Sequence, residues 1–395
     1  MRPLALALVP ALAALVLGCR DDGPSITSPD TAPAAVAAAL QFTQVSAGVE
    51  HACGVATDGA AWCWGANQFG ELGIPVGDSP DPCSSQPCSW RPVAVSGGLT
   101  FRHVTAGQQF TCGVTTGDRV FCWGRNDAGQ LGNGSSAQFS STPVQVAGNR
   151  TYRQVRAGFS MACAIATSRA AFCWGAGRLG NGINGIRRTP VQVSGNLSWA
   201  QLSVGGTHVC GITTADQAWC WGLNNSGQLG NGTRTASLTP VRSAEGFSIA
   251  QIESGSAHTC SVLVDGRAFC WGAGVGVGDG NGSGRRLTPV KVLGDRRWDN
   301  VTTGVAHSCG VSRTERGFCW GLGGNGALGN GSSTDQFTPA RVSGNLAFVA
   351  ISAGGAFTCG VAQDGQAWCW GDNSNGQLGD GTGIDRLRPA AVAGS

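Results

Sequence analysis

The sequence predicts an all-β protein, a seven-bladed β-propeller with about four short antiparallel strands in each blade. Three observations support this fold class. Glycine supplies 64 of the 395 residues, which favours a chain with many turns. Fourteen of the 17 cysteines form seven pairs with one common spacing. These pairs recur with a period near 50 residues, which is typical of propeller blades.

Composition and charge exclude several classes of protein. A hydrophobic content of 42% excludes a disordered chain, and glycine does not recur at every third position as in collagen. A net charge of +3 is too small for a basic nucleic-acid-binding face, so we expect no nucleic-acid partner. The one lysine, Lys291, lies outside any Gly-Lys-Ser/Thr loop, and hydrolase motifs such as His-Glu-x-x-His are absent from the sequence. We therefore expect no enzymatic activity, no cofactor and no metal.

The N-terminus reads as a targeting segment. Residues 1–18 combine an early arginine with a short Leu/Ala/Val run, as in a secretory signal peptide. This run ends in Val-Leu-Gly followed by Cys19, which resembles the bacterial lipoprotein box in which the cysteine is lipidated; the alternative is an ordinary signal peptide followed by an unrelated cysteine. Arg20 after the cysteine favours an outer-membrane lipoprotein of a bacterial envelope. Residues 19–40, rich in Pro, Ser and Ala, then form a flexible tether to a propeller of residues 41–395.

The cysteine pairs define the repeat. The two members of each pair are ten residues apart, and the first members are 59, 51, 47, 50, 49 and 50 residues apart. Each pair is predicted to form a structural disulfide: Cys53 with Cys63, Cys112 with Cys122, Cys163 with Cys173, Cys210 with Cys220, Cys260 with Cys270, Cys309 with Cys319, and Cys359 with Cys369. A repeat of this length makes the chain one closed or stacked domain rather than two or three separate ones.

A hairpin register explains the spacing. With a three-residue turn at 57–59, Cys53 faces Cys63 at a non-hydrogen-bonded site, where Cα atoms are about 4.5 Å apart and a disulfide can form. Two alternatives are open from the sequence: pairs of buried free thiols, and zinc held between hairpins. The same register places Trp64 opposite Ala52, a large residue against a small one. The tryptophan that follows the second cysteine in every repeat is therefore predicted to be core.

Two further strands complete each period. One precedes the hairpin, as at 42–47, 152–157 and 298–303, and one follows a Gly-Gln-Leu-Gly loop, as at 142–146. The link that carries Gly-Gln-Leu-Gly is about twenty residues long, and we expect it to cross to a neighbouring unit. Four short strands in each period describe one propeller blade.

The full repeat resembles a known family. Its pattern Gly-x-x-His-x-Cys-x-Val…Trp-Gly-x-Asn-x-x-Gly-Gln-Leu-Gly-x-Gly…Thr-Pro-Val is similar to the repeat of the regulator of chromosome condensation family, and seven copies cover residues 41–395. The resemblance implies a seven-bladed propeller, here a bacterial, exported variant with a cysteine pair added to each blade. Residues 175–180 lack the Asn and Gln of the motif, and residues 272–284 depart from it further, so the latter loop is expected to be looser.

The resemblance also suggests functions. Eukaryotic relatives are exchange factors for a small nuclear GTPase, but an export signal and many disulfides disfavour that activity here. A secreted bacterial inhibitor of β-lactamase resembles this fold too, which implies that the scaffold can bind proteins outside the cytoplasm.

The five histidines are not interpreted as chemical groups. His51, His208, His258 and His307 occupy one repeat position that holds Phe or Met in the other copies, so we interpret it as a packing site rather than a metal site. His103 stands outside the pattern and has no partner that the sequence identifies. The Gly-x-Gly-x-x-Gly and calcium-loop-like stretches are variants of the repeat loop and are not interpreted as sites.

One insertion lengthens the first period by about nine residues. It lies within 75–92 and contains Cys83 and Cys88, which are predicted to form an eighth, local disulfide. Trp90 and Arg91 beside it are the candidate binding loop, because loops on rigid scaffolds often carry function. The alternative is a length variant without a function.

The sequence therefore predicts an exported, lipid-anchored, monomeric propeller that is not an enzyme and binds an unknown envelope or extracellular protein. The competing prediction is an enzyme or glycan-binding protein with its site in the central mouth. Carboxylates and aromatic side chains converging on that mouth would favour the competing prediction, and a bare, glycine-lined mouth would not.

Overall fold

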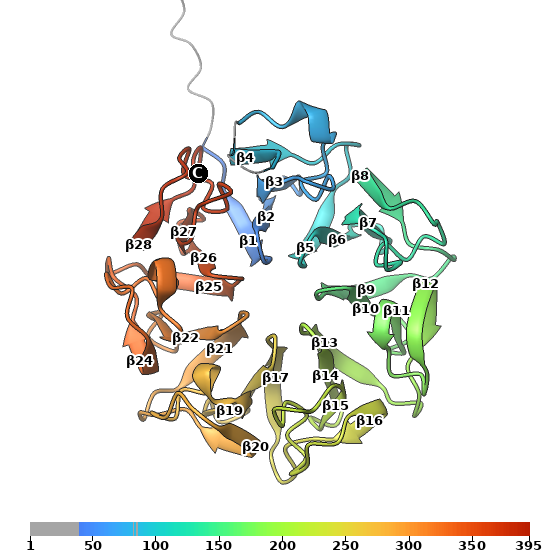
Figure 1. Cartoon of the computed structure of the whole chain (residues 1–395), viewed down its shortest axis with the longest axis vertical. Helices are drawn as coiled ribbons and strands as arrows, with labels where there is room; N and C mark the ends of the chain where they lie inside the picture. The colour runs from blue at the N-terminus through green and yellow to red at the C-terminus, as the bar shows by residue number, and fades with distance from the viewer. Residues whose placement is uncertain (1–38, 82, 84–85) are drawn as a thin grey trace, which may run out of the picture. The chain divides into compact units, whose positions relative to one another are not determined.

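A computed structural model describes residues 39–81, 83 and 86–395. Within this part of the chain, seven four-stranded antiparallel sheets are arranged as blades around a central axis (Figure 1). The four strands of each sheet follow chain order, so every blade is one continuous stretch of sequence. The prediction of a seven-bladed β-propeller with four strands in each blade is confirmed. Cys19 and the predicted signal peptide lie outside the described residues.

The first three blades have the following strands. Blade 1 contains β1 (Phe42–Ala47), β2 (His51–Ala56), β3 (Ala61–Ala66) and β4 (Cys88–Ala94). Blade 2 contains β5 (Phe101–Ala106), β6 (Phe110–Thr115), β7 (Val120–Arg125) and β8 (Phe139–Gln145). Blade 3 contains β9 (Tyr152–Ala157), β10 (Met161–Ala166), β11 (Ala171–Arg178) and β12 (Asn184–Gln192).

The remaining four blades repeat this order. Blade 4 contains β13 (Trp199–Val204), β14 (His208–Thr213), β15 (Ala218–Gly222) and β16 (Ser237–Arg242). Blade 5 contains β17 (Ile249–Ser254), β18 (His258–Leu263), β19 (Ala268–Ala273) and β20 (Arg285–Lys291). Blade 6 contains β21 (Trp298–Thr303), β22 (His307–Ser312), β23 (Gly317–Gly321) and β24 (Gln336–Arg341). Blade 7 contains β25 (Phe348–Ala353), β26 (Phe357–Ala362), β27 (Ala367–Gly371) and β28 (Arg386–Ala391).

The hairpin register matches the prediction residue by residue. Cys53 pairs with Cys63, Ala52 with Trp64, and His51 with Gly65 across β2 and β3. Gly65 has φ +102°, and a Cβ on it would lie 2.7 Å from the Cα of His51. Only glycine fits at this position, because the backbone is left-handed there and the facing strand is too close for a side chain.

The long link contacts the next blade, as where Gly134 N–H donates to the carbonyl oxygen of Arg188, but it ends in its own blade. β3 and β4 are hydrogen-bonded neighbours in one sheet, so the link between them returns to its own blade and the expected crossing is wrong. Because the strands alternate in direction, these links and the β1–β2 type turns share one end of the propeller, here called the link face. The β2–β3 type turns share the other end, here called the turn face.

The core lies between the blades. Each hydrophobic cluster joins the cysteine pair of one blade to the repeat tryptophan of the next, as Cys210 and Cys220 of blade 4 pack with Trp271 of blade 5. The same arrangement closes the ring, where Cys359 of blade 7 packs with Trp64 of blade 1. In residues 39–395, apart from the three undescribed positions, no helix is long and apolar enough to cross a membrane.

Candidate functional site

The sixteen cysteines within residues 39–395 are joined in the predicted pairs. The seven cross-strand disulfides have Cα–Cα distances of 4.0–4.1 Å, and the local disulfide of blade 1 has 5.9 Å. The bonds join Cys53 to Cys63, Cys83 to Cys88, Cys112 to Cys122, Cys163 to Cys173, Cys210 to Cys220, Cys260 to Cys270, Cys309 to Cys319, and Cys359 to Cys369.

This pairing decides between the alternatives that the sequence leaves open. The sulfurs are bonded to each other, so they are neither free thiols nor arranged around zinc. The described residues contain no cluster of three or more His, Cys, Asp or Glu side chains that could hold a metal ion. The cysteines of the blades are therefore structural.

The repeat tryptophans lock neighbouring blades together. In six of the seven blade junctions in the described region, the indole N–H donates to a backbone carbonyl in the long link of the preceding blade, at 2.9–3.0 Å. The pairs are Trp64 to Gln377, Trp123 to Glu71, Trp174 to Gln130, Trp271 to Gln228, Trp320 to Gly276 and Trp370 to Ala327. The divergent link of blade 5, expected to be looser, keeps this bond through Gly276.

Blade 3 is the exception. Its link is a continuation of the β11–β12 hairpin, with Ala176 opposite Ile186 and Arg178 opposite Asn184. Its link lacks the Asn and Gln of the motif, as do the links of blades 5 and 6. In blade 3 alone, the indole N–H that would bond to the link, that of Trp221 in blade 4, is buried without a hydrogen-bond partner among the described residues. The junction between blades 3 and 4 therefore lacks one bond that the other junctions have.

This difference predicts unequal effects of one substitution. Trp271→Phe removes ring area and a hydrogen bond to Gln228, whereas Trp221→Phe removes ring area and a donor that makes no such bond. We expect Trp271→Phe to lower the free energy of unfolding by roughly 2 kcal/mol more than Trp221→Phe. Denaturant unfolding of the two variants beside the wild type measures the difference. Equal losses in the two variants would contradict the assigned role of the indole.

The repeat histidines are not simple packing residues. Each Nε2 lies 2.8–2.9 Å from a Thr or Ser hydroxyl of the next blade. The four pairs are His51 with Thr111, His208 with Thr259, His258 with Ser308 and His307 with Thr358. Each hydroxyl donates to the same carbonyl that receives the tryptophan, so Nε2 must carry the proton and donate. The interpretation of these histidines as packing residues is incomplete, because it considers only the residue that faces each histidine within its own hairpin and not the residues of the next blade.

The sequence contains the signal for these bonds. A histidine in one blade always coincides with Thr or Ser before the first cysteine of the next blade. Where the histidine position holds Phe110, Met161 or Phe357, the next blade has Ala162, Val209 or Ala52 at the matching position. Burial lowers the pKa of His51 and His208 to about 3 and that of His258 and His307 to about 4, so all four are neutral near pH 7.

His103 also has a partner. Its Nε2 lies 2.8 Å from the carbonyl oxygen of Val155 in blade 3. In four of the other six blades the same position on the inner strand holds glutamine, and Gln44 both donates to and accepts from the backbone of Val104 in the next blade. His103 therefore replaces one of these inter-blade clamps, and burial lowers its pKa to about 4.

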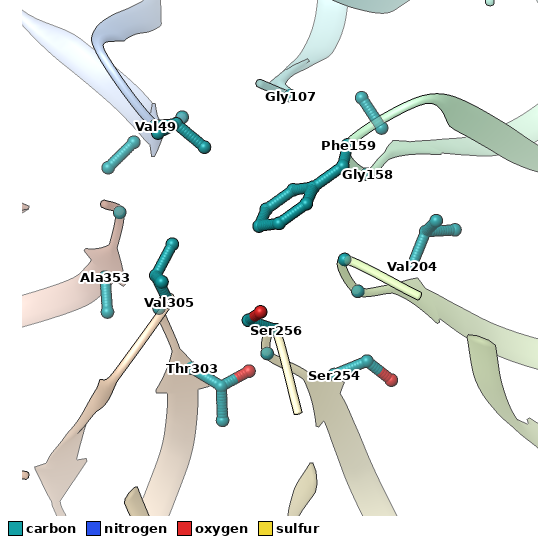
Figure 2. A pocket seen from close by; sticks show the side chains of 18 of the residues that line it. Val49, Gly107, Gly158, Phe159, Val204, Ser254, Ser256, Thr303, Val305 and Ala353 are labelled. Carbon is teal, nitrogen blue, oxygen red and sulfur yellow. The ribbon is translucent and has the colours of Figure 1, made fainter. Parts of the chain in front are cut away.

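The link-face end of the axial channel is bare. It is lined mainly by glycines and small residues of the turns between the first two strands of each blade. Phe159 of blade 3 points into this opening, with Val49 and Val305 across from it (Figure 2). A glycine-lined end without carboxylates does not favour an enzyme or glycan site there.

The inner part of the channel is polar. A cavity of about 300 Å³ is lined by the inner strands, with Gln44, Gln251 and Asn300 among its amides. Arg156 and Glu253 are the charged side chains of this lining in the described residues, and their Nη2 and Oε1 atoms are 3.6 Å apart. A single carboxylate with no aromatic side chain does not match the convergent set expected of the competing prediction.

The candidate binding loop is placed differently from the prediction. Trp90 and Arg91 lie in strand β4, not in a loop. The backbone carbonyl of Trp90 accepts a hydrogen bond from Gly381 of blade 7 at 2.8 Å, and its indole donates to Cys83 Sγ at 3.1 Å. Gln86 of the same insertion donates to Asn375 at 2.9 Å. These contacts hold the first blade against the last, so Trp90 is a half-buried part of that junction.

The β11–β12 hairpin of blade 3 exposes two isoleucines on the link face. Ile183 is 52% exposed and Ile186 is 49% exposed. The register places Arg178 on the same face of the hairpin as Ile186 and places Arg187 on the opposite face. Between Asp127 and Asp216 the chain has no acidic residue and seven arginines, which are Arg150, Arg153, Arg156, Arg169, Arg178, Arg187 and Arg188. Blade 3 is therefore a cationic sector in a chain whose net charge is only +3.

Comparisons with known proteins identify relatives with limited coverage. The chain is 37% identical to the ultraviolet-B receptor UVR8 of Arabidopsis thaliana over 97 residues, which cover 24% of this chain and 20% of the receptor. It is 28% identical to the probable E3 ubiquitin-protein ligase HERC4 of Homo sapiens over 142 residues, which cover 36% of this chain and 13% of the ligase. The matches thus span a fifth or less of these relatives.

Solved structures share the fold. Human WBSCR16 aligns with a TM-score of 0.73 at 19% identity, covering 82% of this chain and 88% of that chain. Prp20p from Saccharomyces cerevisiae aligns with a TM-score of 0.72 at 20% identity, covering 89% and 87%. The ectodomain of the Arabidopsis thaliana receptor kinase ACR4 aligns with a TM-score of 0.55 at 20% identity, covering 90% and 100%. At these identities the likeness shows the fold alone.

Family models settle the relationship. Models of the regulator of chromosome condensation (RCC1) repeat match residues 348–377 and 364–395. The model of the RCC1-like domain matches residues 14–359, which is most of the chain. The chain therefore belongs to the family of proteins with an RCC1-like domain.

Proposed function

We propose that this protein is an exported, lipid-anchored propeller that binds another protein through its link face and catalyses no reaction. The carrying observation is the blade 3 hairpin, which combines the exposed Ile183 and Ile186 with Arg178 and Arg187. Exposed apolar side chains with arginine beside them are typical of protein-binding surfaces.

The charge distribution favours a protein over a uniformly anionic surface as the partner. Blade 3 carries arginines without acids, whereas residues 41–95 of blade 1 carry Glu50, Asp58, Glu71, Asp78 and Asp81 against a single arginine, Arg91. A surface that carries both positive and negative charges suits a partner whose charges form the opposite pattern. A partner with charges of one sign only would be repelled by the part of this surface that has the same sign. The proposed partner is a protein of the cell envelope or the extracellular space, bound by a monomer.

Export is supported by the disulfides. Eight disulfides in one chain suit an oxidising compartment, where such bonds persist. The ACR4 structure is named as the ectodomain of a receptor kinase, so this fold occurs outside cells in at least that protein. The proposed anchor is Cys19, at the end of the apolar run of residues 1–18.

The test is binding after charge reversal in the hairpin. Wild type, Arg178→Glu/Arg187→Glu and Ile183→Ser/Ile186→Ser would each be used to capture proteins from envelope extracts, with identification by mass spectrometry. We expect a protein that wild type retains to lose at least about tenfold of its affinity for each hairpin variant.

A matched control is available in blade 4. Arg234 is an exposed arginine in the corresponding link, so Arg234→Glu reverses one charge outside the hairpin, where the hairpin variant reverses two. It should leave capture unchanged. Retention of every wild-type partner by the hairpin variants would show that the partner binds elsewhere. The anchor is tested by fractionation, in which Cys19→Ser should leave the membrane fraction and wild type should remain in it.

A further inference from the structure

The inner strands form a ring of hydroxyls around the axis. In five of the seven blades described, a Ser or Thr one residue before the end of the inner strand accepts a hydrogen bond from a backbone N–H of the next blade, at 2.8–3.3 Å. These residues are Ser46, Thr105, Ser203, Thr302 and Ser352. Each bond ties two blades together at the channel wall.

Two blades break this ring with charges. Blade 3 has Arg156 and blade 5 has Glu253 at the hydroxyl position. Within the described residues, the hydrogen bond from the next blade's backbone N–H to this position is therefore missing between blades 3 and 4 and between blades 5 and 6. A propeller built from near-identical repeats thus gives up two inter-blade bonds to place one cation and one anion in the same cavity. Departures of this kind from a repeat pattern are expected at functional positions.

The two charges do not satisfy each other fully. Their 3.6 Å separation is longer than a charge-assisted hydrogen bond, and the side chains keep 30% and 19% exposure. Glu253 accepts a hydrogen bond from Ser203 at 2.9 Å, whereas the buried Nε of Arg156 has no partner among the described residues. The guanidinium is therefore not fully hydrogen-bonded, and its side chain remains 30% exposed.

Further unpartnered groups line the same cavity. The hydroxyls of Ser254 and Thr303 are buried without a hydrogen-bond partner in the part of the chain that the structure describes, and Ser254 is only 7% exposed. Buried polar atoms without partners are costly unless a bound molecule satisfies them. They belong to blades 5 and 6, beside the Glu253 side of the charge pair.

We propose that this polar part of the axial channel binds a small zwitterion of the α-amino carboxylate type. Arg156 binds its carboxylate, because guanidinium and carboxylate match in a bidentate geometry. Glu253 binds its ammonium group, and Ser254 and Thr303 supply further polar contacts. A cavity of about 300 Å³ accommodates a molecule of this size. The site lies in the channel and is independent of the blade 3 hairpin.

Calorimetric titration of the full-length protein tests the proposal. The probes are L-alanine, L-serine and L-glutamine, with propionate and L-alaninamide as analogues that carry one of the two charges, and glucose as a neutral polyol. We expect at least one amino acid to bind, and each single-charge analogue to bind at least about tenfold more weakly than L-alanine or not at all. Arg156→Met and Glu253→Gln should each weaken binding by at least about tenfold.

Two variants separate binding from folding. Arg153→Met changes an exposed arginine on the same strand and should leave affinity within about twofold of wild type. Arg156→Ser/Glu253→Thr restores the hydroxyl ring, so it should melt no lower than wild type and yet bind no amino acid. Absence of binding by all three amino acids at about 10 mM, binding that survives Arg156→Met, or preference for glucose would each overturn the proposal.

Discussion

Acidification from pH 6.5 to about pH 5 is expected to lower the free energy of unfolding by about 2 kcal/mol for each buried histidine. Burial holds the pKa of each histidine at about 3 or 4 in the folded protein, below the ordinary value of 6.5. Between these values the unfolded chain binds more protons, so stability falls as the pH falls and levels off near the folded pKa. The combined loss from His51, His103, His208, His258 and His307 is comparable to the whole stability of many domains.

One buried carboxyl works in the opposite direction. Burial raises the pKa of Glu71 to about 7 from the ordinary value of 4.5, so this group costs stability above that range and the cost disappears as the pH falls to 4.5. A single carboxyl does not offset five histidines. Denaturant unfolding followed by tryptophan fluorescence across pH 4 to 8 measures the net slope, which should be positive below pH 6.5. A flat profile between pH 6.5 and pH 5 would contradict the assignment of neutral, buried histidines.

A matched variant isolates one histidine. His208→Phe/Thr259→Val gives the junction between blades 4 and 5 the apolar pairing that Phe110 and Ala162 have between blades 2 and 3. It should reduce the loss between pH 6.5 and pH 5 by about one histidine's share, or 2 kcal/mol, relative to wild type. His208→Phe alone leaves the Thr259 hydroxyl without its donor, so comparison of the two variants reports the coupling of the pair.

The sequence predicts correctly the features that depend on strand pairing within one hairpin. The turn at 57–59 fixes which residues of β2 and β3 face each other, so Cys53, Trp64 and Gly65 lie at the predicted positions. The number of blades equals the number of cysteine pairs with the ten-residue spacing. The strand that precedes the hairpin has the predicted bounds in blades 1, 3 and 6, because β-type residues and flanking glycines mark it.

The features that sequence reasoning misses depend on contacts between blades. The link after β3 cannot be traced by local rules, because it contacts the next blade before it returns to its own sheet. Trp90 resembles an exposed aromatic in the sequence because the glycines it contacts, Gly376 and Gly381, belong to blade 7 at the other end of the chain. His103 and the Arg156–Glu253 pair escape detection for the same reason, since each partner lies in another repeat.

Removing one cross-strand disulfide is expected to lower the free energy of unfolding by up to about 3 kcal/mol. Replacing both Cys260 and Cys270 by Ala opens a loop of ten residues, and the chain-entropy estimate is an upper value because the hairpin retains some order after unfolding. The two sulfurs are fully buried in the cluster that contains Trp320, so the variant also loses packing between blades 5 and 6. Local opening of blade 5 should therefore precede global unfolding, as hydrogen exchange of β18 and β19 would show.

The burial of these disulfides also predicts an order of reduction. The seven cross-strand pairs have no exposed surface, whereas Cys83 of the local pair is half-buried at the edge of blade 1. A thiol reductant must reach a sulfur, so the bond between Cys83 and Cys88 should be reduced first under native conditions and the other seven only after blades open. Timed alkylation with mass spectrometry distinguishes the pairs. Reduction of all eight disulfides at the same rate would contradict this order, because a buried disulfide cannot react without local unfolding. Alkylated thiols throughout in unreduced protein from an oxidising compartment would show that the disulfides do not form.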